Sequence, residues 1–206
     1  MAITDERHGR LRGRTLIAIG LAFNLALLGA AYYVLIGRPA QQEAAAPSQI
    51  GGPFTMTDQN GRTVSDATLR GKPYAIFFGF TRCPDVCPTT LARMARLRRT
   101  LGPDGDRINI VFVSLDPEHD KAKDIGTYVA MFETPIIGLT GAPDQIARIV
   151  RAFHVYYRKV PLTGGDYTID HTASVFLMDT DGEFVTTIDH AESQEMAVAK
   201  MRRLLK

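Results

Sequence analysis

The sequence predicts an α/β fold in which a mixed central sheet lies between helices. Residues 74–80 and 108–115 are continuous apolar runs, which is typical of strands buried on both faces. Helical patterns alternate with these runs and predict β–α–β units, while strand patterns at 172–178 and 183–188 predict an antiparallel hairpin. Both cysteines of the chain lie at the turn after the first run. A thiol turn after a core strand in this setting indicates a thioredoxin-like sandwich.

The other elements follow from local patterns. Asn60-Gly61 stands between two β-prone stretches and predicts a short hairpin over 54–64, because this pair suits a tight turn. Leu91 and Met94 begin a series of apolar residues at helical spacing. The predicted helices are 89–101, 121–132, 143–153 and 192–205, and a short strand is predicted at 136–139.

Length, charge and cysteine content limit the class of protein. With 206 residues and a formal net charge of +2, the chain lacks the basic excess that would indicate a nucleic-acid partner. A domain of this size buries a core without disulfide staples. Its two cysteines are therefore available for chemistry.

The N-terminal region has the pattern of a membrane anchor. Residues 15–36 carry no formal charge and are long enough, as one transmembrane helix, to cross a hydrocarbon core of about 30 Å. Because arginines precede this segment, we expect residues 1–14 in the cytoplasm, 37–51 as a flexible tether and 52–206 as a periplasmic domain on the bacterial inner membrane. The alternative is a cleaved signal peptide with a cleavage site at 44–46, but the apolar stretch is longer than an ordinary signal sequence.

Cys83 and Cys87 are four residues apart at the start of a predicted helix. If Pro84 takes the first helical position, both sulfurs project near the helix N-terminus on roughly one face. Unpaired N–H groups there favour negative charge, so at least one thiol should ionise more easily than a free cysteine. This turn suits thiolate chemistry, either redox chemistry or binding of a soft metal. The other interpretation is a structural disulfide, although so short a loop would add only about 2 kcal/mol of stability.

A histidine could supply a third ligand to these thiols. The candidates are His119, His154, His171 and His190. His171 stands out because it lies immediately before the strand predicted at 172–178. In a thioredoxin-like topology, the loop before that strand faces the thiol turn.

Three segments of the sequence resemble the Sco/SenC family of membrane-anchored copper proteins: FFGFTRCPDVCPTTLARM, VSLDPEHD and DYTIDHTASVFLMDTDGEF. The resemblance covers essentially the whole soluble part from about Gly52. It implies that Cys83, Cys87 and His171 bind one copper ion, as Cu(I) or Cu(II). It also implies that the protein helps to assemble the binuclear copper centre in subunit II of cytochrome c oxidase, with another periplasmic copper chaperone or a thiol reductant as a further partner. Two thiolates and an imidazole suit copper, whereas a closed structural zinc site would want a fourth protein ligand.

Two classes of function remain open for the same cysteines. The first is a copper metallochaperone, which is not an enzyme with turnover. The second is a thiol–disulfide oxidoreductase, in which the redox-active pair Cys83 and Cys87 reduces the copper-ligand cysteines of the oxidase subunit. His171 separates the two, since copper binding requires its imidazole and disulfide exchange does not. A peroxidase of the peroxiredoxin type is not expected, because Phe80 and Ile76 replace the hydroxyl residue and proline that its motif wants before Cys83.

Acidic residues near these motifs are interpreted as structural. Asp116, Glu118 and Asp120 could tune the site or dock a partner, but the favoured interpretation is a solvated loop that caps the helix at Lys121. Asp170 lies beside His171 and could orient its imidazole, but adjacent side chains need not point together. All four are left out of the predicted site.

Overall fold

The computed structural model describes residues 19–32 and 49–205. Residues 19–32 are helical, and the described part of the chain holds no helix that is long and apolar enough to cross a membrane. The anchor predicted at 15–36 extends past the described residues at both ends, and most of the tether predicted at 37–51 lies outside them. Contacts group Gln49–Lys206 into one compact unit, to which the fold and the site below belong.

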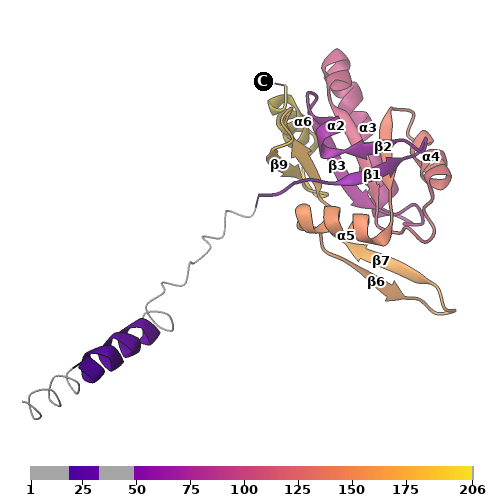
Figure 1. The fold of residues 1–206 in the computed structure, drawn as a ribbon. Helices are drawn as coiled ribbons and strands as arrows, with labels where there is room; N and C mark the ends of the chain where they lie inside the picture. Colours follow the sequence, from indigo (N-terminus) through magenta and orange to yellow (C-terminus); the bar gives the residue numbers. More distant parts are fainter. Residues whose placement is uncertain (1–18, 33–48, 206) are drawn as a thin grey trace, which may run out of the picture. The chain divides into compact units, whose positions relative to one another are not determined.

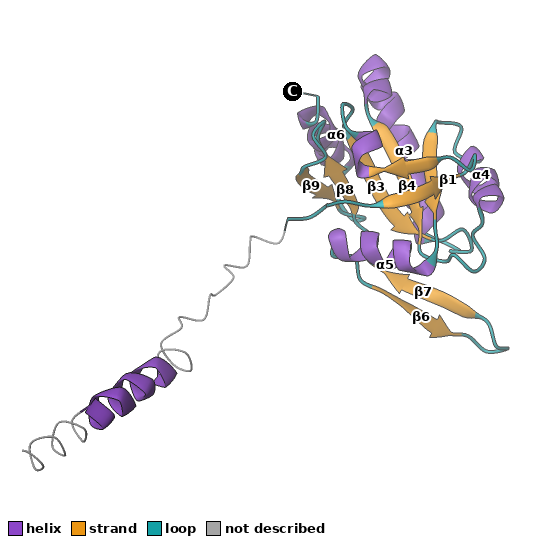
Figure 2. Cartoon of the chain, viewed as in Figure 1, coloured by secondary structure: helices purple, strands orange, loops and turns teal. Residues whose placement is uncertain are grey.

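A seven-stranded mixed sheet forms the centre of this unit (Figure 1, Figure 2). The strand order is β2-β1-β5-β4-β3-β8-β9. The three central strands β3, β4 and β5 are parallel, and the outer strands pair antiparallel. The strands are β1 (Thr55–Asp58), β2 (Thr63–Ser65), β3 (Tyr74–Gly79), β4 (Asn109–Ser114), β5 (Ile136–Thr140), β8 (Val175–Met178) and β9 (Phe184–Ile188). The predicted α/β fold with a mixed, thioredoxin-like sheet is confirmed.

Helices cover both faces of this sheet. They are α2 (Asp66–Leu69), α3 (Val86–Leu101), the 3-10 helix η1 (Gly102–Arg107), α4 (Ala122–Ala130), α5 (Pro143–Ala152) and α6 (Gln194–Arg203). On one face, Phe112 of β4 packs against Tyr128 of α4, with ring centroids 5.4 Å apart. On the other face, Phe78 of β3 packs against Phe153, which directly follows α5, with ring centroids 5.3 Å apart. The core therefore has two layers, separated by the sheet.

Strand β3 is buried along its whole length, as its continuous apolar sequence predicts. Its side chains alternate between the two faces. Phe77 points to the face that carries α3 and α4, where it packs against Phe112, and a side chain at Gly79 would point to the same face. The end of β3 is thus fixed between two packed layers, and the thiol turn starts from this rigid point.

A second, two-stranded sheet lies beside the main one and consists of β6 (Tyr157–Pro161) and β7 (Tyr167–His171) (Figure 1). The sequence patterns above do not predict this hairpin. Its strands are antiparallel, and Tyr157 pairs with His171. His171 is therefore the last residue of a strand, whereas the prediction placed it in a loop before β8.

Candidate metal centre

A buried carboxylate holds the turn that carries Cys83. Asp120 is fully buried and accepts hydrogen bonds from the Thr81 N–H at 2.9 Å and the Thr81 hydroxyl at 2.6 Å. The Ser114 hydroxyl, at the end of β4, donates to the same carboxylate at 2.6 Å. Asp120 thus joins the thiol turn to the end of the neighbouring strand. The prediction that Asp120 lies in a solvated loop is wrong.

Helix α3 begins at Val86, and Cys87 lies in its first turn. Pro84 precedes the helix, so the expectation that it occupies the first helical position is wrong. Pro88 sits in the first turn instead, where a missing N–H leaves no intrahelical bond unmade. Cys83 consequently lies in the turn before the helix, and its sulfur accepts a hydrogen bond from the Cys87 N–H at 3.4 Å.

The two thiols have different environments. Cys87 is fully buried, whereas Cys83 is partly exposed. A hydrogen bond from the Cys87 thiol, aided by contact with His171, outweighs burial and lowers the pKa of Cys83 to about 4. The same hydrogen bond, together with burial, raises the pKa of Cys87. The negative charge of the pair therefore lies on Cys83, the sulfur that solvent can reach.

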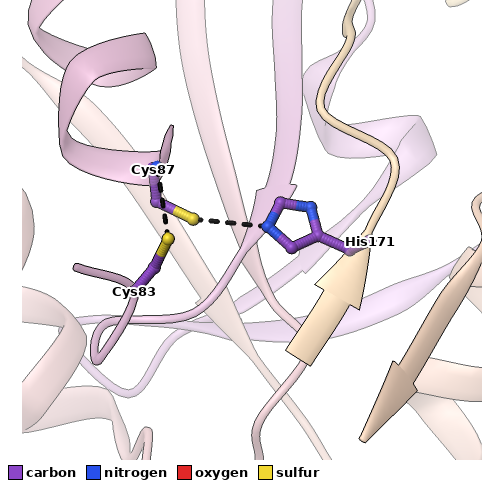
Figure 3. A group of neighbouring side chains, drawn as sticks. All are labelled: Cys83, Cys87 and His171. Carbon is purple, nitrogen blue, oxygen red and sulfur yellow. Dashed lines mark hydrogen bonds between the residues drawn. The ribbon is translucent and has the colours of Figure 1, made fainter. Parts of the chain in front are cut away.

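His171 faces the thiols from the end of β7 (Figure 3). Its Nε2 lies 3.5 Å from Cys87 Sγ, and its Nδ1 lies 2.9 Å from the carbonyl oxygen of Thr172. Because a carbonyl oxygen only accepts, Nδ1 carries a proton in this arrangement, and Nε2 is the ring nitrogen that faces the sulfur. The rings of Phe77 and Phe80 contact the imidazole edge-to-face at centroid distances of 6.0 and 6.1 Å.

The structure thus brings together the three predicted site residues. One ligand atom each from Cys83, Cys87 and His171 lies within 4.8 Å of the others. The ligand atoms of one ion can be separated by at most two bond lengths, about 4.3 Å for a sulfur and a nitrogen at typical zinc distances. The 3.5 Å between Cys87 Sγ and His171 Nε2 is within this limit. The donor set and its spacing fit a single soft metal ion.

Asp170 takes no part in this arrangement. Its side chain is exposed, and the Thr172 carbonyl orients the imidazole of His171.

Asp116 is buried, contrary to the prediction of a solvated loop. Its carboxylate accepts hydrogen bonds from the Tyr167 hydroxyl at 2.6 Å, from His119 Nδ1 at 3.0 Å and from Arg82 Nη2 at 3.3 Å. Burial favours its neutral form, but these three donors outweigh burial and lower the pKa of Asp116. Glu118 is exposed, as predicted.

The expected capping of α4 by this loop is also wrong. The N–H of Lys121, at the N-cap, donates to the Asp124 carboxylate at 3.0 Å. Asp124 lies within the helix itself. The acids at 116 and 120 are instead directed toward the thiol turn and β7.

Two residues beside the site were missed, namely Arg82 and Tyr167. Tyr167 lies in the unpredicted hairpin, which has Gly164-Gly165 in its turn. A glycine pair between β-prone stretches is a hairpin signal, so the sequence contained one indication of the β6–β7 hairpin. Arg82 gives no such signal, because its partners are far away in the sequence.

Taken together, the fold and site define a thioredoxin-like domain with two thiols and one imidazole at a single turn. A family model described as SCO1/SenC matches residues 42–206. The chain belongs to the SCO1/SenC family.

Solved structures and curated relatives agree with this assignment. The structure of Bradyrhizobium japonicum ScoI with copper bound is 46% identical, with a TM-score of 0.70, and the match covers 75% of this chain and 99% of that one. BsSco, described as having a disulfide switch and as a member of the Sco family of cytochrome c oxidase assembly proteins, is 26% identical, with a TM-score of 0.59, and the match covers 76% of this chain and 92% of that one.

The mitochondrial SCO1 homolog 1 of Arabidopsis thaliana is 37% identical over 146 residues, which is 69% of this chain and 43% of the relative. For the mitochondrial SCO2 homolog of Bos taurus the match is 35% identical and covers 81% of this chain and 65% of the relative. The chain therefore spans between about two fifths and two thirds of these relatives.

Proposed function

We propose that this protein is a copper metallochaperone that acts in cytochrome c oxidase assembly. The observation that carries the proposal is the convergence of Cys83, Cys87 and His171 on one point. Two thiolates and an imidazole are ligands that suit Cu(I) and can also hold Cu(II). The copper bound by the similar ScoI, and the place of BsSco among oxidase assembly proteins, support the same function.

The geometry suits a metal that must be passed on. Cys87 is fully buried and would bind the ion from the protein interior. Cys83 and His171 are partly exposed and would bind it on the side that faces solvent. Three protein ligands leave a position at which a partner's ligand can enter. Binding requires both thiols to lose their protons and the imidazole to offer Nε2, the nitrogen that faces Cys87, as its ligand atom.

The target we propose is the binuclear copper site of cytochrome c oxidase subunit II, which the protein loads with copper or prepares for loading. Residues 15–36, which carry no formal charge, would anchor it in the bacterial inner membrane. The N-terminus would then be cytoplasmic and the thiol site periplasmic. A second periplasmic copper chaperone or a thiol reductant would resupply the site.

Copper titration of the reduced full chain in detergent tests the proposal. We expect one copper per chain, and a thiolate-to-copper absorption band in the Cu(II) form. His171→Ala should abolish that band, while His190→Ala, which changes an exposed histidine away from the site, should leave it unchanged. Wild-type protein that binds no copper, or a band that survives in His171→Ala, would overturn the proposed site.

A second function is favoured by the low pKa of the partly exposed Cys83. As a thiol–disulfide oxidoreductase, its thiolate would attack a disulfide of the oxidase subunit and release one substrate thiolate. Cys87, after losing its proton to solvent, would then attack Cys83 Sγ, which releases the second substrate sulfur as a thiolate and leaves a Cys83–Cys87 disulfide. The substrate gains two electrons and the protein loses them. Rapid reduction of a model disulfide that is unaffected by His171→Ala, with no copper binding, would favour this function over the first.

A further inference from the structure

The hairpin that carries His171 is attached to the domain by few polar contacts. Strands β6 and β7 form their own sheet, separate from the seven-stranded one. Among the described residues, and apart from the bond of His171 to the adjacent Thr172 carbonyl, side-chain hydrogen bonds and ion pairs from 157–171 to other segments reach only two places. These are the thiol turn at 82–87 and the loop at 116–119. The position of His171 therefore depends on these contacts and on local packing.

Tyr167 and His171 lie on the same face of β7, with the buried Ile169 between them. The Tyr167 hydroxyl donates to Asp116 Oδ1 at 2.6 Å, and His171 Nε2 lies 3.5 Å from Cys87 Sγ. Four residues of strand separate these two contacts by about 13 Å. One end of this face of β7 is thus held by the hydrogen bond from Tyr167 to Asp116, and the other end by the contact of His171 with Cys87.

Asp116 also connects this strand to the thiol turn. Arg82 precedes Cys83, and its Nη1 donates to both carboxylate oxygens of Asp166 at 2.9 Å. Its Nη2 reaches Asp116 Oδ2 at 3.3 Å, and its guanidinium lies 5.2 Å from the centroid of the Tyr167 ring. One guanidinium and one buried carboxylate therefore join the segment of Cys83 to the strand of His171.

Burial makes the contact between Tyr167 and Asp116 important. The Asp116 carboxylate has no exposed surface, so water cannot replace a donor that is removed. In addition, the imidazole ring is held to the backbone by the Thr172 carbonyl. A shift of β7 would thus move Nε2 away from the sulfur instead of being absorbed by ring rotation.

We propose that Tyr167 is a positioning residue, which keeps His171 at the thiols by fastening the β6–β7 hairpin to buried Asp116, with Arg82 and Asp166 as a second fastening. This proposal rests on the proposed copper function only for the role of His171 as a ligand. The fastening itself is a property of the metal-free protein. Cu(II), which depends more on the imidazole, should be affected more than Cu(I), which two thiolates hold well.

The test compares Tyr167→Phe with the matched control Tyr156→Phe, in the full chain in detergent. Tyr167→Phe removes one hydroxyl and keeps the ring, while Tyr156 is an exposed tyrosine next to the same hairpin. Two rates are measured: hydrogen exchange of amides 157–171 in the metal-free protein, and removal of Cu(II) and of Cu(I) by a chelator. We expect about tenfold faster hairpin exchange and about tenfold faster loss of Cu(II) in Tyr167→Phe, with a smaller change for Cu(I) and none in Tyr156→Phe.

Unchanged hairpin exchange in a folded Tyr167→Phe would overturn the proposal, and so would faster exchange with unchanged Cu(II) loss. If Tyr167→Phe fails to fold, Asp166→Asn is the deciding variant. The Asp166 side chain is exposed, and apart from a bond to the Tyr167 N–H it contributes only to the second fastening. We then expect a smaller effect in the same direction, and no effect would overturn the proposal. Wild-type protein that binds no copper would refute the metallochaperone function, while the exchange rates would still decide whether the fastening exists.

Discussion

Gly79 and Cys87 lie so close together that a Cβ atom on Gly79 would be 2.7 Å from Cys87 Sγ. Contacts of this kind under 3.0 Å are essentially never observed for real Cβ atoms. The same Cβ would meet the rings of Phe112 and Phe77 at 3.1 and 3.2 Å, so the surrounding core could not easily yield. The missing side chain at the end of β3 thus allows the sulfur of Cys87 to sit against the sheet.

Gly79→Ala should therefore displace the Cys87 sulfur and weaken copper binding. We expect a loss of about 1–3 kcal/mol in the free energy of unfolding, as for other overpacked cores. Urea unfolding and chelator competition for copper would measure the two effects. Gly126→Ala is the matched control, because a Cβ at this position in α4 meets only ordinary contacts from 3.5 Å. It should preserve copper binding and leave stability unchanged or higher by up to about 1 kcal/mol.

Cys83 should be alkylated at a rate that is nearly independent of pH between 6 and 8. Its pKa near 4 means that it is already a thiolate throughout this range. The alkylation rate of a free cysteine rises roughly 80-fold over the same interval, because its thiol titrates near pH 8.5. Mass spectrometry after brief treatment of the metal-free protein with iodoacetamide would locate the label, which buried Cys87 should not carry.

Cys87→Ala is the informative variant for this measurement, because alanine carries no hydrogen-bond donor. It removes the thiol whose hydrogen bond contributes most to the low pKa of Cys83. The alkylation rate of Cys83 should then rise more with pH than in the wild type. A wild-type profile like that of a free cysteine would contradict the assignment of the negative charge to Cys83.

Asp120→Ala should destabilise the domain by about 3 kcal/mol or more. The change leaves the Thr81 N–H, the Thr81 hydroxyl and the Ser114 hydroxyl without their shared acceptor. Asp120→Asn keeps one carbonyl acceptor and should cost less. Urea unfolding would compare both with Asp104→Ala, which breaks only an exposed ion pair with Arg107 and should cost less than about 1 kcal/mol. Equal stability of Asp120→Ala and Asp104→Ala would contradict this role.

Local patterns were sufficient to predict the main sheet and the thiol site. Strands β3 and β4 are buried on both faces, and their continuous apolar sequences show this directly. Cys83 and Cys87 follow from the strand-to-helix turn. His171 could be selected because the topology places the chain before β8 next to that turn, although the residue proved to end a strand.

The acidic loop and the hairpin could not be predicted in the same way. Asp116 and Asp120 look like part of a solvated DPEHD turn, because their partners Tyr167 and Thr81 are 51 and 39 positions away. Strand β6 consists of partly buried and exposed residues, without regular alternation and with no fully buried position. Its hairpin also makes long-range polar contacts, on which hydrophobic periodicity carries no information.

The attachment of the hairpin should also depend on acid pH. Because the folded pKa of Asp116 lies below the ordinary carboxyl value of 3.8, its carboxylate contributes stability that is fully present above about pH 4. This contribution is lost as the pH falls through the lower folded pKa. Protection factors for hydrogen exchange of amides 157–171, compared with those of β3 and β4, should therefore be constant from pH 7 to pH 5 and fall at more acidic pH.

In Tyr167→Phe, which already lacks one donor to Asp116, the fall in protection should be smaller. Protection lost between pH 7 and pH 5, or an equal fall in both proteins, would show that the Tyr167–Asp116 hydrogen bond does not hold the hairpin.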